Sequence, residues 1–176
     1  MNIQDFVAAT FGLSIAGVVT VSVGYYLLKQ DIHQYLKLKS SESEGTARKE
    51  LLTLRLQAHE RLILFVDRIN PASLFLRLHQ QGMSAAVLHA LILEEVRTEY
   101  QYNVTQQLYI GTTTWQAVRK LKEDTLIMIN HARQSLPDEA LAAELCKMVL
   151  QHLGGMEHNP YDLSQELITK EIHLLF

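Results

Sequence analysis

The stretch FVAATFGLSIAGVVTVSVGYYLL, residues 6–28, runs for 23 residues without an acidic or basic side chain. At a rise of 1.5 Å per residue, a helix of this length extends about 34 Å, which exceeds the roughly 30 Å thickness of a bilayer's hydrocarbon core. Core helices of soluble proteins rarely run so far without an ionisable group. The sequence therefore predicts an N-terminal transmembrane helix at residues 1–28. We expect it to be retained, because MNIQD lacks the basic start of a signal peptide.

Basic residues follow this stretch within 20 positions and none precedes it. They are Lys29, Lys37, Lys39 and Arg48. The positive-inside rule therefore predicts that the N-terminus lies outside and that the remainder of the chain lies in the cytoplasm. Tyr25 and Tyr26 fall at the cytoplasmic interface, where a tyrosine ring can lie in lipid while its hydroxyl stays in water.

Small residues recur at every fourth position of the expected span. They are Ala8, Gly12, Ala16, Thr20 and Gly24. Such a row lets a second helix backbone approach closely, which predicts self-association or pairing with another membrane protein. The alternative is that these residues are simply common in membrane helices, and the sequence leaves both interpretations open.

Residues 29–46 form a separate segment between the expected span and the remainder of the chain. Residues 29–39, KQDIHQYLKLK, are amphipathic, and they either extend the membrane helix or lie on anionic lipid. We favour the extension. Residues 40–46, SSESEGT, are short and polar and predict a linker.

Residues 47–176 predict a helical domain, because apolar residues recur every three or four positions throughout. The first helix carries the row Leu51, Leu54, Ala58, Leu62, Phe65 and Ile69. Capping residues and prolines mark the later helices. We expect these at 71–81, at 85–110 with Ser84 as N-cap, from a threonine cap at 112–114 onward, around 141–153, and from Pro160 to near Phe176. Pro137 is expected to mark a helix start as well. Short connections between such helices predict an all-α, antiparallel bundle.

Charge and cysteine content exclude several classes of function. The net charge is −3 and no block of Lys or Arg occurs, which argues against a nucleic-acid partner. Cys146 is the single cysteine, so the chain has neither an internal disulfide nor a Cys-x-x-Cys metal motif. Cys146 lies on an apolar stripe, where we expect a buried and unreactive thiol.

Metal and catalytic motifs are likewise missing. None of the eight histidines follows a glutamate by three positions, so the Glu-x-x-His pattern of di-iron bundles does not occur. The chain also lacks HExxH, GxSxG, a P-loop and GxGxxG. We therefore predict no cofactor and no catalytic residue. His59 lies beside the apolar row of its helix, and we expect a hydrogen-bonded core or boundary residue there.

Two charged groups remain as candidate interaction sites. Glu94, Glu95 and Glu99 crowd one helix, and we expect either a solvated face or ion pairs with Arg or Lys of a neighbouring helix; a metal or a basic partner is the alternative. The region 48–77 is rich in arginine, including Arg55, Arg61, Arg68 and Arg77. Ordinary surface pairing is favoured for these arginines, and docking of an acidic partner or of lipid phosphate is the alternative.

Three segments resemble an uncharacterised bacterial family of small, single-pass, helical membrane proteins. They are RLQAHERLILFVDRINP (residues 55–71), TEYQYNVTQQLYI (98–110) and the following Trp115. The resemblance covers nearly the whole chain and implies a bacterial inner-membrane location without an assigned activity. It also implies an aromatic residue more often than histidine at position 59, so His59 departs from the pattern.

Together these observations predict a membrane-anchored, cytoplasm-facing helical bundle that serves as a non-catalytic interaction or scaffold protein. The expected partners are the lipid bilayer and either further copies of the chain or other membrane proteins. Two alternatives stay open: an enzyme or metal protein that uses Glu94, Glu95, Glu99 and a histidine, and a module that binds anionic lipid through residues 29–39.

Overall fold

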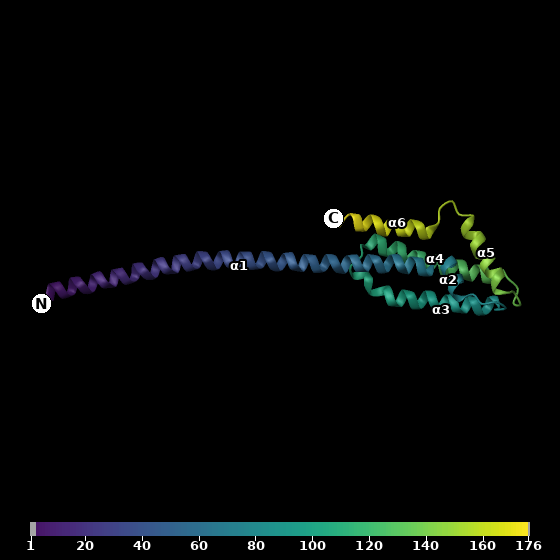
Figure 1. Ribbon diagram of the computed structural model, residues 1–176, viewed down its shortest axis with the longest axis horizontal. Coiled ribbons are helices and arrows are strands. Elements are labelled where there is room, and N and C mark those ends of the chain that lie inside the picture. Colours follow the sequence, from purple (N-terminus) through teal and green to yellow (C-terminus); the bar gives the residue numbers. More distant parts are fainter. Residues whose placement is uncertain (1–2, 176) are drawn as a thin grey trace. The chain divides into compact units, whose positions relative to one another are not determined.

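The computed structural model describes the backbone of residues 3–175, with the side chains of residues 12, 14–27, 29 and 45–175. Within these residues the secondary structure is helical, and the predicted all-α fold is confirmed (Figure 1). The elements in order are α1 (Ile3–Ile69), α2 (Pro71–Leu78), α3 (Ala85–Asn103), the short 3-10 helix η1 (Val104–Leu108), α4 (Thr112–Gln134), α5 (Ala142–Gly154) and α6 (Pro160–His173).

The chain divides into two compact units, Met1–Glu50 and Leu51–Phe176. In the first unit, residues 40–46 are helical, whereas the sequence predicts a linker there. The physical reason lies in the residue types. Gly45 has the lowest helix propensity of the segment, at a cost of about 1 kcal/mol, and no proline is present to interrupt the backbone hydrogen bonds.

The predicted membrane span receives no support from the structure. Among the residues described, no helix is long and apolar enough to cross a membrane. The predicted span lies partly outside the described side chains, which leave out residues 6–11, 13 and 28. The side chains of residues 30–39, in the expected amphipathic segment, are also outside them. Membrane anchoring therefore stays a prediction from the sequence.

Three helices begin at the caps that the sequence predicts. The side chains of Asn70 and Asn159 accept hydrogen bonds from the backbone N–H groups of Ala72 and Tyr161, and each asparagine precedes a proline at the first helical position. The Ser84 side chain accepts from the N–H of Val87.

The prediction that Pro137 starts a helix is wrong. The backbone after Pro137 instead makes a turn, and α5 begins only at Ala142. Two hydrogen bonds fix this later start: the Ala85 N–H donates to the Ala140 carbonyl at 2.8 Å, and the Ala142 N–H donates to the Met83 carbonyl at 2.9 Å. The starts of α3 and α5 are thereby joined, which holds the backbone before α5 extended.

The helix expected over residues 85–110 is shorter in the structure. Its α-helical part ends at Asn103, and five residues of 3-10 helix follow. The Asn103 side-chain amide donates to the Glu99 carbonyl at 2.8 Å, an interaction that competes with the helical backbone bond at this position.

The core of the Leu51–Phe176 unit lies where α3, α4 and α6 run side by side, each antiparallel to the next (Figure 1). The end of α1 contributes residues with no exposed surface, Ala58, Leu62, Val66 and Ile69, together with the nearly buried Phe65. Phe65, Tyr100 and Trp115 follow one another as an aromatic series, with ring centroids 6.3 Å and 5.9 Å apart. The antiparallel packing expected from the short connections is therefore present in this unit.

Candidate functional site

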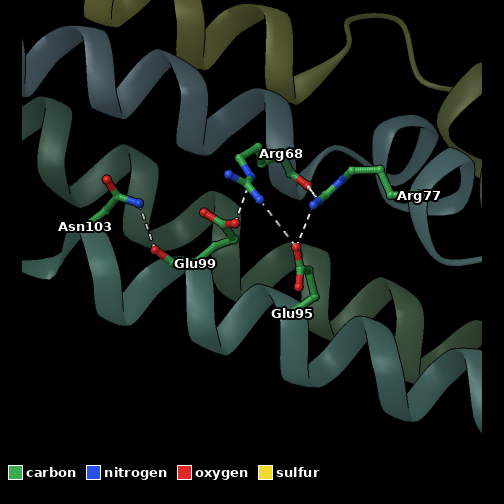
Figure 2. A network of polar contacts seen from close by, with 5 residues as sticks. All are labelled: Arg68, Arg77, Glu95, Glu99 and Asn103. Atoms are coloured by element: carbon green, nitrogen blue, oxygen red, sulfur yellow. Dashed lines mark hydrogen bonds and ion pairs between the residues drawn. The ribbon is translucent and has the colours of Figure 1, made fainter.

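A cluster of two glutamates and two arginines joins α1, α2 and α3 (Figure 2). The Arg68 guanidinium donates through Nε to Glu99 Oε1 at 2.7 Å, and its Nη2 lies 3.8 Å from Glu95 Oε1. Arg77 pairs with the same Glu95 oxygen through Nη1 and donates through Nη2 to the Arg68 carbonyl at 2.8 Å. We call these four residues the Arg–Glu cluster.

The Arg–Glu cluster explains how two glutamates are tolerated one turn apart on α3. Like charges at such a spacing destabilise a helix by a few tenths of a kcal/mol. Glu99 is largely buried, with 10% of its side chain exposed, so its carboxylate needs a partner. Arg68 reaches both carboxylates from α1, so of the two expected arrangements Glu95 and Glu99 have the ion pairs and not the solvated face.

The other predicted site residues lie apart from the Arg–Glu cluster. Glu94 is exposed on α3 and contributes nothing to it, Arg61 is exposed on α1, and Arg55 belongs to a second polar group. Among the described residues, no group of three or more His, Cys, Asp or Glu side chains is arranged to hold a metal ion.

A surface hollow of about 300 Å³ lies beside the cluster, between α1 and α3. Its lining residues are Arg61, Leu64, Phe65, Arg68, Glu99, Tyr102 and Asn103. Leu64 and Tyr102 are exposed by 54% and 68%, and the Arg61 guanidinium makes no ion pair within the part of the chain that the structure describes. The hollow thus combines an apolar side chain, an aromatic side chain and an available cation.

The Arg68–Glu99 pair is expected to stabilise the Leu51–Phe176 unit. Arg68→Leu leaves the Glu99 carboxylate without its charged partner, and we expect a loss of about 1–2 kcal/mol, reduced from the fully buried case because Arg68 is half exposed. The double variant Arg68→Leu/Glu99→Leu should recover most of this loss. Urea unfolding followed by Trp115 fluorescence measures both free energies, with Arg61→Leu as the matched control. Additive losses in the double variant would show that the two residues are not coupled.

The second polar group is formed by Arg55 and His59 of α1, Glu171 of α6 and the backbone before α4; Arg55 Nη2 lies 3.8 Å from Glu171 Oε1. His59 has no exposed surface, and its Nδ1 donates to the Arg55 carbonyl at 2.6 Å. Its Nε2 lies 3.2 Å from Glu171 Oε1, at ion-pair distance but not aligned as a hydrogen bond. The expected hydrogen-bonded core histidine is confirmed, and it faces a carboxylate.

Glu171 also takes the place of a side-chain cap at the start of α4. The sequence predicts a threonine cap among residues 112–114, and this prediction is wrong: the N-cap is Gly111 and lacks a side-chain bond. The Gly111 N–H instead donates to Glu171 Oε1 at 2.7 Å. A Cβ at position 111 would lie only 3.0 Å from that oxygen, so glycine permits the close approach.

The surroundings of Glu171 favour its charged form. Burial by itself raises the pKa of the carboxyl, but hydrogen bonds from the Thr114 side chain and the Gly111 N–H, together with the charge of nearby His59, outweigh burial. The pKa of Glu171 is consequently held below its ordinary value of 4.5. The ionised carboxylate thereby links α1, α4 and α6.

Because the folded-state pKa of Glu171 is lowered, its contribution to stability is present above about pH 4.5 and is lost as the pH falls through the folded-state value. We expect Glu171→Gln to cost about 1–2 kcal/mol at pH 7 and progressively less below pH 4.5. Urea unfolding at several pH values measures the difference from wild type. Glu166→Gln, an exposed change on the same helix, is the control. A difference that grows on acidification would contradict this assignment.

Sequence reasoning missed Glu171 as a site residue. No local pattern marks it, because its partners lie 60 positions away at Gly111 and on α1, and only the folded chain brings them together. An unpaired acid near the C-terminus of an otherwise amphipathic helix is too common to serve as a signal.

Two other predicted features lie outside these groups. Gly12, Ala16, Thr20 and Gly24 lie on α1, whereas the Ala8 side chain is outside the described residues; Thr20 Oγ1 donates to the Ala16 carbonyl at 2.8 Å. Cys146 is half-buried on α5 and not buried as expected, and this partial burial raises the pKa of its thiol from the ordinary value of 9.0. A raised pKa disfavours the thiolate, in agreement with the unreactive thiol expected there.

A comparison with protein families matches a family of unknown function, DUF7935, over residues 5–175. The chain belongs to the DUF7935 family. No protein with a curated description and no solved structure matches it. The prediction that the chain belongs to a family without an assigned activity is thus confirmed. The bacterial origin and the single membrane pass that the resemblance implies stay predictions.

Within this DUF7935 protein, the two polar groups differ in what they offer to a partner. The His59–Glu171 group is mostly buried and joins three helices, which is typical of a structural role. The Arg–Glu cluster borders the hollow at Arg61, where an arginine and an aromatic residue face solvent. The hollow is therefore the better candidate for binding another molecule.

Proposed function

We propose that this DUF7935 protein is a membrane-anchored, non-catalytic interaction protein. Residues 6–28 would lie in the bilayer, and the Leu51–Phe176 unit would bind a protein partner. The observation that carries the proposal is the uncharged stretch itself, whose described side chains Ile15, Val18, Val19, Val21 and Val23 are 54–72% exposed on α1. Apolar surface of this extent is stabilised when it leaves water, at about 25 cal/mol per Å².

Lipid is the favoured environment because α1 has no charged side over this stretch. At 100° per residue, positions 15, 18, 19, 21 and 23 cover an arc of about 200° and the uncharged Ala16, Gly17, Thr20 and Gly24 fall in the rest, and a helix without a charged side is typical of a membrane span. The basic residues after position 28 favour a cytoplasmic location for the Leu51–Phe176 unit. The proposed membrane is the bacterial inner membrane, with the N-terminus outside.

The row Gly12, Ala16, Thr20 and Gly24 supports an oligomeric anchor. A Cβ added at Gly12 or Gly24 would meet no atom within 4 Å, so space for a neighbouring backbone is present at both. Close approach at such positions is how membrane helices gain packing energy. We propose that copies of the chain, or another membrane protein, pair with α1 here.

The proposed protein contact is the hollow beside the Arg–Glu cluster. Arginine and tyrosine are enriched among the residues that contribute most to binding, and Arg61 and Tyr102 both face solvent there. Arg68 is already engaged by Glu95 and Glu99, so Arg61 is the cation available to a carboxylate of the partner. The occupant we propose is an acidic segment of a membrane-associated protein.

The proposal can be tested by photocrosslinking in native membranes. A photoreactive residue replaces Tyr102 in the full-length protein, and the matched control replaces Leu163, which is 50% exposed on α6. We expect a discrete adduct from position 102 only, lost in Arg61→Glu and retained in Arg61→Lys, with the crosslink on an acidic peptide. An adduct that forms equally from position 163, or that persists in Arg61→Glu, would rule out this contact.

A further inference from the structure

A second cavity, remote in sequence from the Arg–Glu cluster, lies between α4, α5 and the start of α6. Its volume is about 340 Å³, within the range of small-molecule sites. Leu121, Met128, Leu153 and Met156 supply apolar walls. Methionine side chains adapt readily to the shape of a bound molecule, so these walls suit an apolar ligand.

One polar group lining this cavity is the hydrogen-bonded pair of Thr125 and Tyr161, whose two hydroxyl protons are both used. The Thr125 hydroxyl donates to the Leu121 carbonyl at 2.7 Å, and its oxygen lies 2.7 Å from Tyr161 Oη. Since the threonine proton is used, Tyr161 must be the donor in the second bond. The remaining capacity of Tyr161 Oη is therefore to accept a hydrogen bond.

A negative charge accompanies this acceptor. Asp124, one position before Thr125, lines the cavity and makes no ion pair within the described part of the chain. Burial raises the pKa of Tyr161, and the charge of Asp124 raises it further. Tyr161 consequently remains a neutral phenol at physiological pH, and the Asp124 carboxylate lines the same cavity.

We infer that this cavity binds a small organic cation, an ammonium group on an apolar stem. The ammonium group donates to Tyr161 Oη and to the Asp124 carboxylate, while the stem contacts Met128 and Met156. His131 and His152 also line the cavity. The inference is independent of the proposed protein contact, because no residue is shared with the hollow at Arg61.

Methyl-labelled methionine reports directly on this site. The chain has five methionines; Met128 and Met156 line the cavity, Met148 lines an adjoining hollow, and Met83 lines neither. Full-length protein in lipid nanodiscs is titrated with 4-phenylbutylamine, with the corresponding alcohol and with the corresponding carboxylate. We expect the amine to shift the Met128 and Met156 methyl signals and to leave that of Met83 in place, with an affinity at least tenfold above that of the carboxylate.

Asp124→Asn provides the matched test, since the residue is exposed and the substitution removes only the charge. We expect it to weaken amine binding at least fivefold, to the level of the alcohol. Asp67→Asn, the same change at an exposed site on α1, should leave binding unchanged. Equal binding of amine and carboxylate, no response of Met128 and Met156, or unchanged affinity in Asp124→Asn would each overturn the inference.

Discussion

Replacing Val18 and Val19 together by arginine is expected to release the protein from membranes. Both positions lie near the middle of the uncharged stretch, and an arginine at the centre of a membrane helix costs about 2.5–3.5 kcal/mol. Two such changes cost about 5–7 kcal/mol, enough to reverse a partition that otherwise favours lipid. The measurement is the fraction of full-length protein that sediments with membranes after expression in bacteria.

The matched control for this variant is Leu51→Arg/Leu54→Arg. It introduces the same charges at two exposed leucines of α1 outside residues 6–28. The control protein should sediment as wild type does. If both double variants stay with the membrane to the same extent, the uncharged stretch is not what holds the protein there.

The largest expected effect on stability is that of Phe65→Ala. Phe65 is 1% exposed and lies between the core of the Leu51–Phe176 unit and the Tyr100 ring. Truncation of a buried phenylalanine typically costs about 3–5 kcal/mol, because apolar contacts are lost and a cavity is left. Trp115 is the single tryptophan and is nearly buried, so urea unfolding followed by its fluorescence reports on this unit.

Leu64→Ala is the neighbouring control for Phe65→Ala. Leu64 is 54% exposed on the same helix, and its truncation should cost less than about 1 kcal/mol. Similar losses for the two variants would mean that α1 does not present the buried face that the structure assigns to it.

Local signals in the sequence predict much of the fold. The caps at Asn70, Ser84 and Asn159 depend on residues within three positions, and the structure has helices starting at each. The buried face of α1 follows from spacing alone from Ala58 onward, whereas Leu51 and Leu54 on the same row are exposed. Periodicity identifies which side of a helix is apolar, but it does not say how far along the helix the packing partners extend.

Two of the incorrect predictions share a physical cause, since both depended on contacts beyond the local sequence. Pro137 was expected to start a helix, but hydrogen bonds to Met83 and Ala85 hold the backbone before α5 extended. The α4 start was expected to use a threonine, but Glu171 arrives from the last helix and binds Gly111 instead. Local propensity has no access to such partners.

The candidate sites also contain features that local sequence predicts and features that depend on how the helices pack. Two glutamates one turn apart on an amphipathic helix predict a nearby cation, and the structure supplies Arg68 and Arg77. Which arginine pairs with which glutamate depends on how α1, α2 and α3 pack, so it was not predictable from spacing. The cavity at Tyr161 was likewise invisible in the sequence, because Thr125 and Tyr161 meet only across two helices.

We propose above that residues 6–28 are embedded in a bilayer. The most direct test of this proposal is to wash membranes that contain the full-length wild-type protein with alkaline carbonate and to measure where the protein goes. We expect the protein to stay with the sedimented lipid and to dissolve only in detergent. Full-length protein released into the supernatant without detergent would contradict the proposal.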